Sequence, residues 1–439
     1  MLRRIPRRSA PALIAGAAMV LAACGSAGPA PSSQANFRQP PATGSGLGAV
    51  GGQVGLPVAA TLAAIPADNP QTPDKVALGA RLFFDRRLSL DGSVACGSCH
   101  NPTRAFTDGR AVSIGIQGRV GQRNAPTILN ALYDKTLFWD GRTTTLEEQA
   151  VLPILNPSEM GQPDLDTAVA AIAKDARYQQ AFQQVFGRAP SGPDLVRAIA
   201  SYERSEIAFT SPFDAFIGGN PDAISDSAKR GWALFETKAR CSSCHAAPNL
   251  KPDRTFFMDN SFHNTGVGID RHNVIALACR AQSRLNSGDV IAVDQAAIQS
   301  ELSALGSFLV TKQPADIATF KTPSLRNVLI TAPYFHDGSE RTLWDVMDHY
   351  NKGGMNNPWL DRNIQPLALS EKDIEDLIAF MASLTSAQYR EQGEKELARQ
   401  REIARTMRPE RDMVHAFSPK PARPDPSLAC VAKVAAAGE

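Results

Sequence analysis

The chain has 439 residues, of which 46 are Lys or Arg, 44 are Asp or Glu and 43% are hydrophobic. This length is enough for two or three folded domains. The formal net charge is +2, and it becomes −2 without the four arginines of residues 1–11. A balance so close to neutrality excludes the strongly basic surface that nucleic-acid binding requires, so no nucleic acid is expected as a partner.

The first residues have the pattern of an export signal. Residues 1–11 are basic, and the apolar run 12–23 is too short to span a bilayer. Leu21-Ala22-Ala23-Cys24 follows, which predicts a lipoprotein signal peptide over 1–23 with Cys24 lipidated after cleavage. An ordinary signal peptide with an incidental cysteine is the alternative. Both interpretations predict a periplasmic protein, and in the first the lipid anchor is its only attachment to the membrane.

Residues 24–59 are rich in Gly, Ala, Pro, Ser and Gln and have few large apolar side chains. Such a segment cannot bury enough surface to fold, so a flexible tether is predicted here.

Two copies of the motif Cys-x-x-Cys-His follow, at Cys96-Gly97-Ser98-Cys99-His100 and Cys241-Ser242-Ser243-Cys244-His245. In c-type haem attachment the two cysteines bind the vinyl groups and the histidine becomes the proximal iron ligand. A redox dithiol or half of a zinc site is the alternative for one isolated copy. Two copies in an exported chain, without second halves for zinc, predict two covalently bound haem c groups.

A longer internal repeat surrounds each motif. Gly-x-x-Leu-Phe precedes it, and Pro-x-x-x-Asn, nine residues, Asp-Gly, four residues and Leu follow with identical spacing in both halves. The positions are Gly79, Leu82, Phe83, Pro126, Asn130, Asp140, Gly141 and Leu146 in the first copy, and Gly231, Leu234, Phe235, Pro323, Asn327, Asp337, Gly338 and Leu343 in the second. The repeat predicts two related haem domains in tandem, over 60–218 and 219–385.

Hydrophobic periodicity and chain breakers predict an all-α fold of two cytochrome-c-like domains, with the boundary near 218–225. The predicted helices lie at 74–85, 145–153, 165–187, 193–217, 225–239, 342–350 and 370–384. Residues 270–314 are interpreted as an insertion in the second domain. The tail 386–439 begins with a charged stretch, 386–411, that predicts a solvated helix or a contact surface for a partner.

Besides Cys24, two cysteines lie outside the haem motifs. Cys279 belongs to the insertion and Cys430 to the Pro-rich tail. In an oxidising compartment they can form a disulfide, and two free thiols are the alternative.

The repeat allows the two haem sites to be compared. Seven residues after the repeat leucine stand Pro153 in the first half and Tyr350 in the second. Seven residues are two helical turns, so both positions share a face with their leucine. Proline cannot bind iron, whereas a tyrosine phenolate can. An open first haem and a closed second haem are therefore predicted, with Met347 and His349 as alternative ligands to Tyr350.

The histidines support this asymmetry, because none of the seven lies between residues 101 and 244. Met160 is the other soft ligand near the first haem, and a place in the core is its more common role. Cleaving a peroxide O–O bond needs a group that takes a proton and returns it, which a carboxyl in an apolar pocket can do. Gln149 and Glu159 lie in the segment beside the first haem, although a surface position is the more common one for a glutamate.

Several stretches within residues 70–385 resemble the bacterial dihaem cytochrome c peroxidase and MauG family. They are Leu82-Phe83-Phe84-Asp85, the first haem motif, Ser113-Ile114-Gly115, Arg123-Asn124-x-Pro126-Thr127, Phe138-Trp139-Asp140-Gly141, Glu148-Gln149-Ala150, Leu325-Arg326-Asn327 and Pro333-Tyr334-Phe335-His336-Asp337-Gly338. The resemblance implies hydrogen peroxide chemistry at the N-terminal haem and electron storage at the C-terminal one. The electron donor would be a small cytochrome, a cupredoxin or a protein substrate.

Matched motif by motif, the resemblance implies a role for several residues. His100 and His245 would be proximal ligands, and Gln149 and Glu159 the distal polar pair, with Glu159 as the acid–base residue. Trp139 would relay electrons or holes between the haems.

The resemblance also implies an interdomain calcium site. Its ligands would be Asn124 and the backbone carbonyls of Thr331 and Pro333, completed by water. His336, the repeat equivalent of Trp139, would lie near the haems without binding iron.

Two departures from the peroxidases favour the MauG-like branch. Ile116 stands where they carry a histidine that blocks the first haem until reduction, and Tyr350 stands where they carry a methionine. The sequence also departs from MauG itself. Ala239 stands where MauG has the tryptophan through which it passes holes, and this weighs against MauG's own maturation reaction. Trp232 is a possible substitute relay, although packing is its more common role. A dihaem peroxidase, a MauG-like protein oxidase and a non-catalytic electron-transfer protein therefore remain as function classes.

Overall fold

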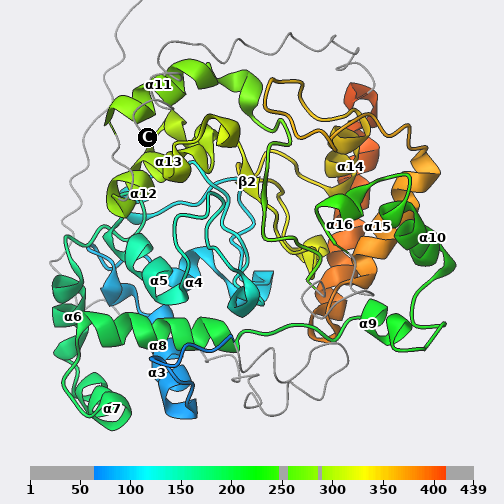
Figure 1. Ribbon diagram of the computed structural model, residues 1–439. Helices are drawn as coiled ribbons and strands as arrows, with labels where there is room; N and C mark the ends of the chain where they lie inside the picture. Colours follow the sequence, from blue (N-terminus) through cyan, green and yellow to red (C-terminus); the bar gives the residue numbers. More distant parts are fainter. Residues whose placement is uncertain (1–63, 247–255, 285–288, 412–439) are drawn as a thin grey trace, which may run out of the picture. The chain divides into compact units, whose positions relative to one another are not determined.

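The computed structural model describes residues 64–246, 256–284 and 289–411, in which helices alternate with long loops (Figure 1). In these ranges the β-sheet consists of two short antiparallel strands of two residues each, β1 (Phe262–His263) and β2 (Phe320–Lys321). The all-α prediction is therefore confirmed. The predicted signal peptide, the tether over 24–59, Cys24 and Cys430 lie outside the described residues.

All the α-helices of the first half except the short turn Cys96–Cys99 begin at residues whose side chains accept a hydrogen bond from a backbone N–H of the first turn. These caps are Thr72, Thr145, Asp164, Asp175 and Ser191. The helices are α3 (Pro73–Phe83), the short turn α4 (Cys96–Cys99), α5 (Leu146–Leu155), α6 (Leu165–Ala173), α7 (Ala176–Phe186) and α8 (Gly192–Ser205). Their apolar faces meet in one core, in which Leu78, Leu82, Phe83, Phe182 and Leu195 are fully buried.

The second half has a core of its own around Phe213, Phe235, Phe257, Leu377 and Phe380. Its helices are α9 (Pro212–Ile217), α10 (Asp226–Glu236), α14 (Leu343–Asn351), α15 (Glu371–Ser383) and α16 (Arg390–Arg411). The insertion contributes α11 (Val274–Arg284), α12 (Val290–Gln299) and α13 (Phe308–Thr311), and these helices share a third apolar cluster. Within the described ranges, no helix has the length and apolarity that crossing a bilayer requires.

The predicted helix boundaries are wrong at two places. The helix predicted over 165–187 is interrupted, because Asp175 leaves the helical conformation and caps α7. The helix predicted over 193–217 ends at Ser205, and a new one begins at Pro212. The residue before a proline is driven away from helical backbone angles, and Ser211 is extended as this rule requires.

The charged stretch over 386–411 is mostly helical, as predicted, and Gln400 of its helix α16 is fully buried. Gln400 accepts a hydrogen bond from the backbone N–H of Leu343 at 2.8 Å and donates one to the carbonyl of Leu329 at 3.0 Å. α16 therefore packs on the start of α14 through this side chain, and the solvated face or partner surface predicted for the stretch stays a prediction.

The internal repeat extends to the way its helices pack. A Cβ added to Gly79 of α3 would come within 1.9 Å of the carbonyl oxygen of Ala198 in α8. A Cβ added to Gly231 of α10 would come within 1.8 Å of the carbonyl oxygen of Asp376 in α15. Each repeat glycine thus permits the same close crossing of two helices, visible in Figure 1 as the pairs α3 with α8 and α10 with α15.

The loops after the haem motifs repeat as well. Three repeat positions have left-handed backbone angles in each half. They are the asparagine of Pro-x-x-x-Asn, the phenylalanine two residues before Asp-Gly, and the glycine of Asp-Gly. Their φ values are 66° and 61° for Asn130 and Asn327, 65° and 67° for Phe138 and Phe335, and 75° and 63° for Gly141 and Gly338. The equal spacing in the sequence therefore encodes equal turns. The division into two haem domains at 218–225 stays a prediction.

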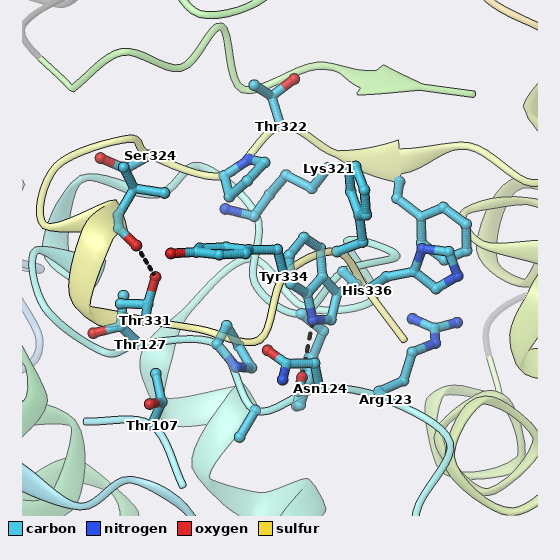
Figure 2. Close-up of a pocket in the computed structure, with 18 of the residues that line it drawn as sticks. Thr107, Arg123, Asn124, Thr127, Lys321, Thr322, Ser324, Thr331, Tyr334 and His336 are labelled. Carbon is cyan, nitrogen blue, oxygen red and sulfur yellow. Dashed lines mark hydrogen bonds between the residues drawn. The ribbon is translucent and has the colours of Figure 1, made fainter. Parts of the chain in front are cut away.

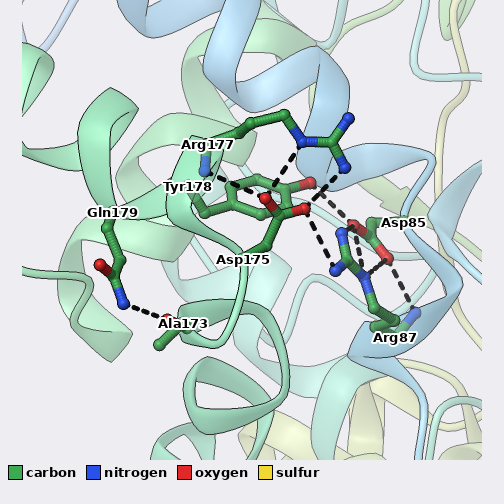
Figure 3. Close-up of polar contacts among 7 residues, drawn as sticks. All are labelled: Asp85, Arg87, Ala173, Asp175, Arg177, Tyr178 and Gln179. Carbon is green, nitrogen blue, oxygen red and sulfur yellow. Dashed lines mark hydrogen bonds and ion pairs between the residues drawn. The ribbon is translucent and has the colours of Figure 1, made fainter.

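Polar contacts fasten α7 to the end of α3 (Figure 3). The hydroxyl of Tyr178 donates to Asp85 at 2.8 Å, and the guanidinium of Arg87 bonds to Asp85 and reaches Asp175 at 3.4 Å. Arg87 is 44% exposed, so solvent weakens these ion pairs. They hold the periphery of the first half, while the buried residues of its core hold the haem motif.

Candidate active site

One continuous cavity of about 370 Å³ is lined by residues of both Cys-x-x-Cys-His motifs. Both halves of the repeat contribute to its wall (Figure 2). The labelled residues are Thr107, Arg123, Asn124 and Thr127 from the first half, and Lys321, Thr322, Ser324, Thr331, Tyr334 and His336 from the second. The cavity therefore joins the two predicted haem sites.

The two motif histidines are held in the same way. The Nδ1 atom of His100 donates to the carbonyl of Phe106 at 3.1 Å, and that of His245 donates to the carbonyl of Phe257 at 2.8 Å. Both phenylalanines have left-handed backbone angles, with φ of 59° and 55°. A ring that donates from Nδ1 keeps the Nε2 lone pair free for a metal. Burial lowers the pKa of both imidazoles, which favours the neutral, ligating form.

The cysteines fit covalent haem as well as the histidines do. Cys96, Cys99, Cys241 and Cys244 are free thiols and all line the cavity. Cys279 is disulfide-bonded, so its partner is not one of these four. The predicted partner, Cys430, lies outside the described residues. The four haem-motif thiols therefore remain available for thioether bonds.

The distal residues of the first site come from α5 and from the turn that follows it. Gln149 and Pro153 line the cavity one helical turn apart, and Glu159 lines it from the turn 156–161. The Oε2 atom of Glu159 is buried and has no hydrogen-bond partner. Burial raises the pKa of this carboxyl to about 8, with a further contribution from Asp294. A carboxyl of this kind can hold a proton near neutral pH and release it to a reacting group.

The loop that contains Ile116 packs directly on the turn of Glu159. The backbone N–H of Ile116 donates to the carbonyl of Glu159 at 2.9 Å, and the Ile116 side chain is 1% exposed. Gly115 has no room for a side chain, because a Cβ would lie 2.0 Å from the carbonyl oxygen of Ser158. A buried apolar side chain therefore fills the position for which the resemblance implies a switch histidine.

Of the three candidate ligands at the second site, two reach the cavity. Tyr350 and Met347, both in α14, line it. Met347 is 3% exposed and belongs to the apolar core of the second half, and burial raises the pKa of the Tyr350 phenol. His349 instead directs Nε2 to the carbonyl of Thr265, at 2.9 Å.

Trp139 lines the cavity to which both motifs contribute, and its indole N–H donates to the carbonyl of Asn124 at 3.0 Å. His336, at the equivalent place in the repeat, stacks on Phe320 with ring centroids 3.5 Å apart. Burial lowers the pKa of His336 to about 3, so this ring is neutral. Trp232 packs edge-on against Phe213, with ring centroids 5.2 Å apart. This contact agrees with the packing role that was the more common alternative to a relay.

The three predicted calcium ligands also line the cavity: Asn124, Thr331 and Pro333. The side-chain amide of Asn124 donates to the carbonyls of Arg110 and Ala111 at 2.9 and 3.3 Å. The donor set is thus rich in oxygen but, among these residues, contains no carboxylate.

Sequence reasoning missed a cluster of buried charges behind the turn 156–161, which is called the distal turn below. Arg142 forms ion pairs with Asp140 and with Asp294, each at 2.8 Å. Asp140 belongs to the repeat and to the Phe-Trp-Asp-Gly stretch, neither of which predicts an ion pair, and Arg142 stands directly after its Asp-Gly pair. Asp294 lies in the insertion, which has no counterpart in the first half, and nothing local in the sequence marked it.

Two Cys-x-x-Cys-His sites define a c-type haem protein, and a buried carboxyl lines the same cavity. Residues 73–222 match the family described as "Di-haem cytochrome c peroxidase". The chain is 37% identical over 322 residues to "Methylamine utilization protein MauG" of Methylophilus methylotrophus, covering 73% of this chain and 84% of that one. It is 36% identical over 327 residues to "Cytochrome-c peroxidase IdrP1" of Pseudomonas sp. (strain SCT), covering 74% and 84%.

A crystal structure of a MauG-like protein associated with microbial copper homeostasis has a TM-score of 0.61 and 32% identity to this chain, covering 74% of this chain and 92% of that one. The chain belongs to the dihaem cytochrome c peroxidase and MauG family. It is therefore an oxidoreductase of the peroxidase class that binds two haem c groups.

Proposed function

We propose that this protein reduces hydrogen peroxide at the haem attached to Cys96 and Cys99, while the haem attached to Cys241 and Cys244 stores and relays oxidising equivalents. The two haems would belong to tandem cytochrome-c-like domains. The observation that carries the proposal is the Glu159 carboxyl, which has a buried oxygen without a partner and lines the cavity beside Pro153. An open iron and a proton-transferring group are the two requirements of peroxide cleavage.

The first haem, held by Cys96, Cys99 and His100, would supply an iron centre for redox chemistry with hydrogen peroxide. Glu159 in its ionised form takes the proton of the bound peroxide and then returns it to the departing oxygen, which leaves as water. The Gln149 amide, one turn before Pro153, orients the peroxide by hydrogen bonding. Trp139 gives the oxidising equivalents a path to the second site, because it lines the cavity that the two sites share.

The reaction of the diferric protein with hydrogen peroxide tests this function. Because Glu159 must be ionised to accept the proton and its pKa is raised to about 8, the second-order rate constant is expected to increase with pH and to level off above this value. Stopped-flow spectroscopy between pH 6 and about 10 measures it. A long-lived oxidised species should form without prior reduction. Two six-coordinate haems that stay inert to peroxide in every redox state would exclude the proposal.

Tyr350 is the proposed sixth ligand of the second haem. We expect Tyr350→Phe to change the absorption and paramagnetic-resonance spectra of the low-spin haem, because phenylalanine has no atom that can bind iron. Met347→Leu is the matched variant, since Met347 also lines the cavity. If Met347→Leu changes the low-spin spectrum and Tyr350→Phe does not, methionine is the ligand.

We further propose a calcium ion bound by Asn124 and the carbonyls of Thr331 and Pro333. The oxygen-rich donor set supports a hard cation, and water would complete the shell. Removal of calcium with a chelator is expected to lower the midpoint of thermal unfolding and to slow the peroxide reaction, and added calcium should restore both. Metal analysis that finds no calcium in the purified protein would contradict the site.

A MauG-like oxidase that modifies a partner protein is the second candidate function. Ile116 and Tyr350, at the two positions where the sequence departs from the peroxidases, favour it, and Ala239 weighs against the specific reaction of MauG. Rapid steady-state peroxide reduction with a small cytochrome or cupredoxin would identify a peroxidase. A protein oxidase would instead turn over slowly with such donors. A non-catalytic electron carrier would need a second ligand at the first haem, and Pro153 cannot supply one.

The leader supports a periplasmic location with a lipid anchor on Cys24. Haem attachment to Cys-x-x-Cys-His in bacteria takes place outside the cytoplasm, which agrees with an exported chain. Mass spectrometry of the mature N-terminus would identify the lipid on Cys24 or its absence.

A further inference from the structure

Four buried charged side chains form a cluster behind the distal turn of the first haem site. Arg142 pairs with Asp140 and Asp294 at 2.8 Å, and Arg123 stands 3.6 Å from Asp140. All four side chains are 4% exposed or less. Two positive and two negative charges balance, so the cluster is neutral as a whole.

One member of the cluster, Asp294, comes from α12 of the insertion, more than 130 residues from the distal turn. Its Oδ1 accepts from Arg142, and its Oδ2 accepts from the side-chain amide of Asn156. From the same helix, Gln299 donates to the Asn156 carboxamide oxygen at 3.3 Å. A second contact from the insertion joins Arg123 to the hydroxyl of Ser303, at 2.6 Å. The insertion is therefore fastened to the back of the distal pocket.

Asn156 in turn holds the residues that surround Glu159. Its backbone carbonyl accepts the N–H groups of Glu159 and Gly161 at 3.0 and 2.9 Å, and its Oδ1 accepts the N–H of Ser158 at 2.9 Å. The backbone of the distal turn is thus bonded to Asn156 on several sides. Because Asp294 is hydrogen-bonded to the Asn156 side chain, it is linked through Asn156 to the turn that contains Glu159.

We propose that Asp294 is a positioning residue, which holds the turn of Glu159 in place through Asn156 and brings a buried negative charge near the Glu159 carboxyl. The proposal rests on the proposed function, in which Glu159 transfers protons. It also assigns a role to residues 270–314, which the internal repeat leaves unexplained.

The electrostatics around Glu159 agree with this role. After burial, the negative charge of Asp294 is the main influence that raises the pKa of Glu159, and Arg142 opposes it. Asp140 and Arg123 complete the cluster, and Arg119 touches the outer side of the turn by donating to the carbonyl of Pro157 at 2.7 Å. Since the cluster is already neutral, ionising Glu159 adds a negative charge without a partner.

The test is the titration of Glu159 in the full-length protein with both haems bound. Infrared difference spectroscopy against pH gives the midpoint from the band of the protonated carboxyl, which is assigned by its loss in Glu159→Gln. Asp294→Asn removes the negative charge and keeps the side-chain shape, so we expect the midpoint to fall by about one pH unit or more. Glu301→Gln is the control, because it removes a charge that is 54% exposed on the same insertion. An unchanged midpoint in Asp294→Asn would overturn the proposal.

Asp294→Asn leaves Arg142 without one partner in a buried place and can therefore impair folding. The double variant Arg142→Gln/Asp294→Asn removes one charge of each sign and keeps the cluster neutral. Because the effect of Asp294 on Glu159 exceeds that of Arg142, the midpoint of the double variant should lie below that of the wild type and above that of Asp294→Asn. A midpoint at or above the wild-type value would contradict the proposal even if the single variant does not fold.

The outcomes separate this inference from the proposed function. If the wild type reacts with peroxide and Asp294→Asn titrates like the wild type, the function stands and the positioning role fails. If the midpoint shifts as expected in a protein that does not react with peroxide, the positioning role stands and the function fails.

Discussion

Glu159→Gln is expected to lower the second-order rate constant of the diferric protein with hydrogen peroxide by about 10²- to 10⁴-fold, the usual contribution of a general acid–base group. Glutamine has nearly the same shape and can donate a hydrogen bond, but it cannot take up the peroxide proton. The haem spectrum of the resting protein should change little, because the substitution leaves both proximal histidines untouched. Stopped-flow measurements at several peroxide concentrations give the rate constant directly.

The matched control for this loss is Glu148→Gln, the same chemical change in the first turn of α5. Glu148 is exposed, and its carboxylate accepts from the backbone N–H of Thr144 at 3.1 Å. The rate constant of this variant should equal that of the wild type. A comparable loss in both variants, or an undiminished rate in Glu159→Gln, would exclude Glu159 as the acid–base residue.

Arg326→Ala should cause the largest loss of stability among single substitutions at the buried ion pairs. Arg326 and Asp214 form two hydrogen bonds of 2.7 and 2.8 Å, and their side chains are 1% and 3% exposed. Arg326 also donates to the carbonyl of Phe209 at 3.0 Å. Removing the arginine leaves a buried carboxylate without its cation, which costs about 3–5 kcal/mol. Unfolding by urea, followed by circular dichroism of the haem-loaded protein, measures the effect.

Lys395→Ala is the comparison for this substitution. Lys395 pairs with Glu391 on α16, where the two side chains are 74% and 82% exposed. Water and salt screen such a pair, so its removal should leave the unfolding midpoint unchanged. A similar shift of the unfolding midpoint in the two variants would mean that burial does not determine how much the Arg326 ion pair contributes to stability.

The fold class was predictable because the repeated residues have repeated structural tasks. Gly79 and Gly231 stand where two helix backbones touch, and Asn130 and Asn327 stand where the chain turns with left-handed angles. Requirements of this kind restrict the residue type at one position and therefore remain visible in the sequence. The exact helix ends were harder to predict, because the cap formed by Asp175 competes with an apolar periodicity that continues through it.

The candidate site was only partly predictable. The repeat spacing directed attention to the segment with Gln149 and Glu159, and both residues line the cavity. Their chemical roles stay predictions. The buried cluster with Arg142 and Asp294 could not be predicted, because its members are separated by 152 residues and only the folded insertion brings them together. Such long-range contacts have no local pattern from which they could be inferred.

The tight packing of Gly115 on the carbonyl of Ser158 limits how this distal loop can be re-engineered. Any side chain at position 115 would displace the backbone on which Glu159 stands, so a loop grafted here from another protein must keep a glycine at this position. A graft without that glycine would require a matching change in the 156–161 turn. In natural divergence the two segments would accordingly change together, although more than 40 residues of chain separate them.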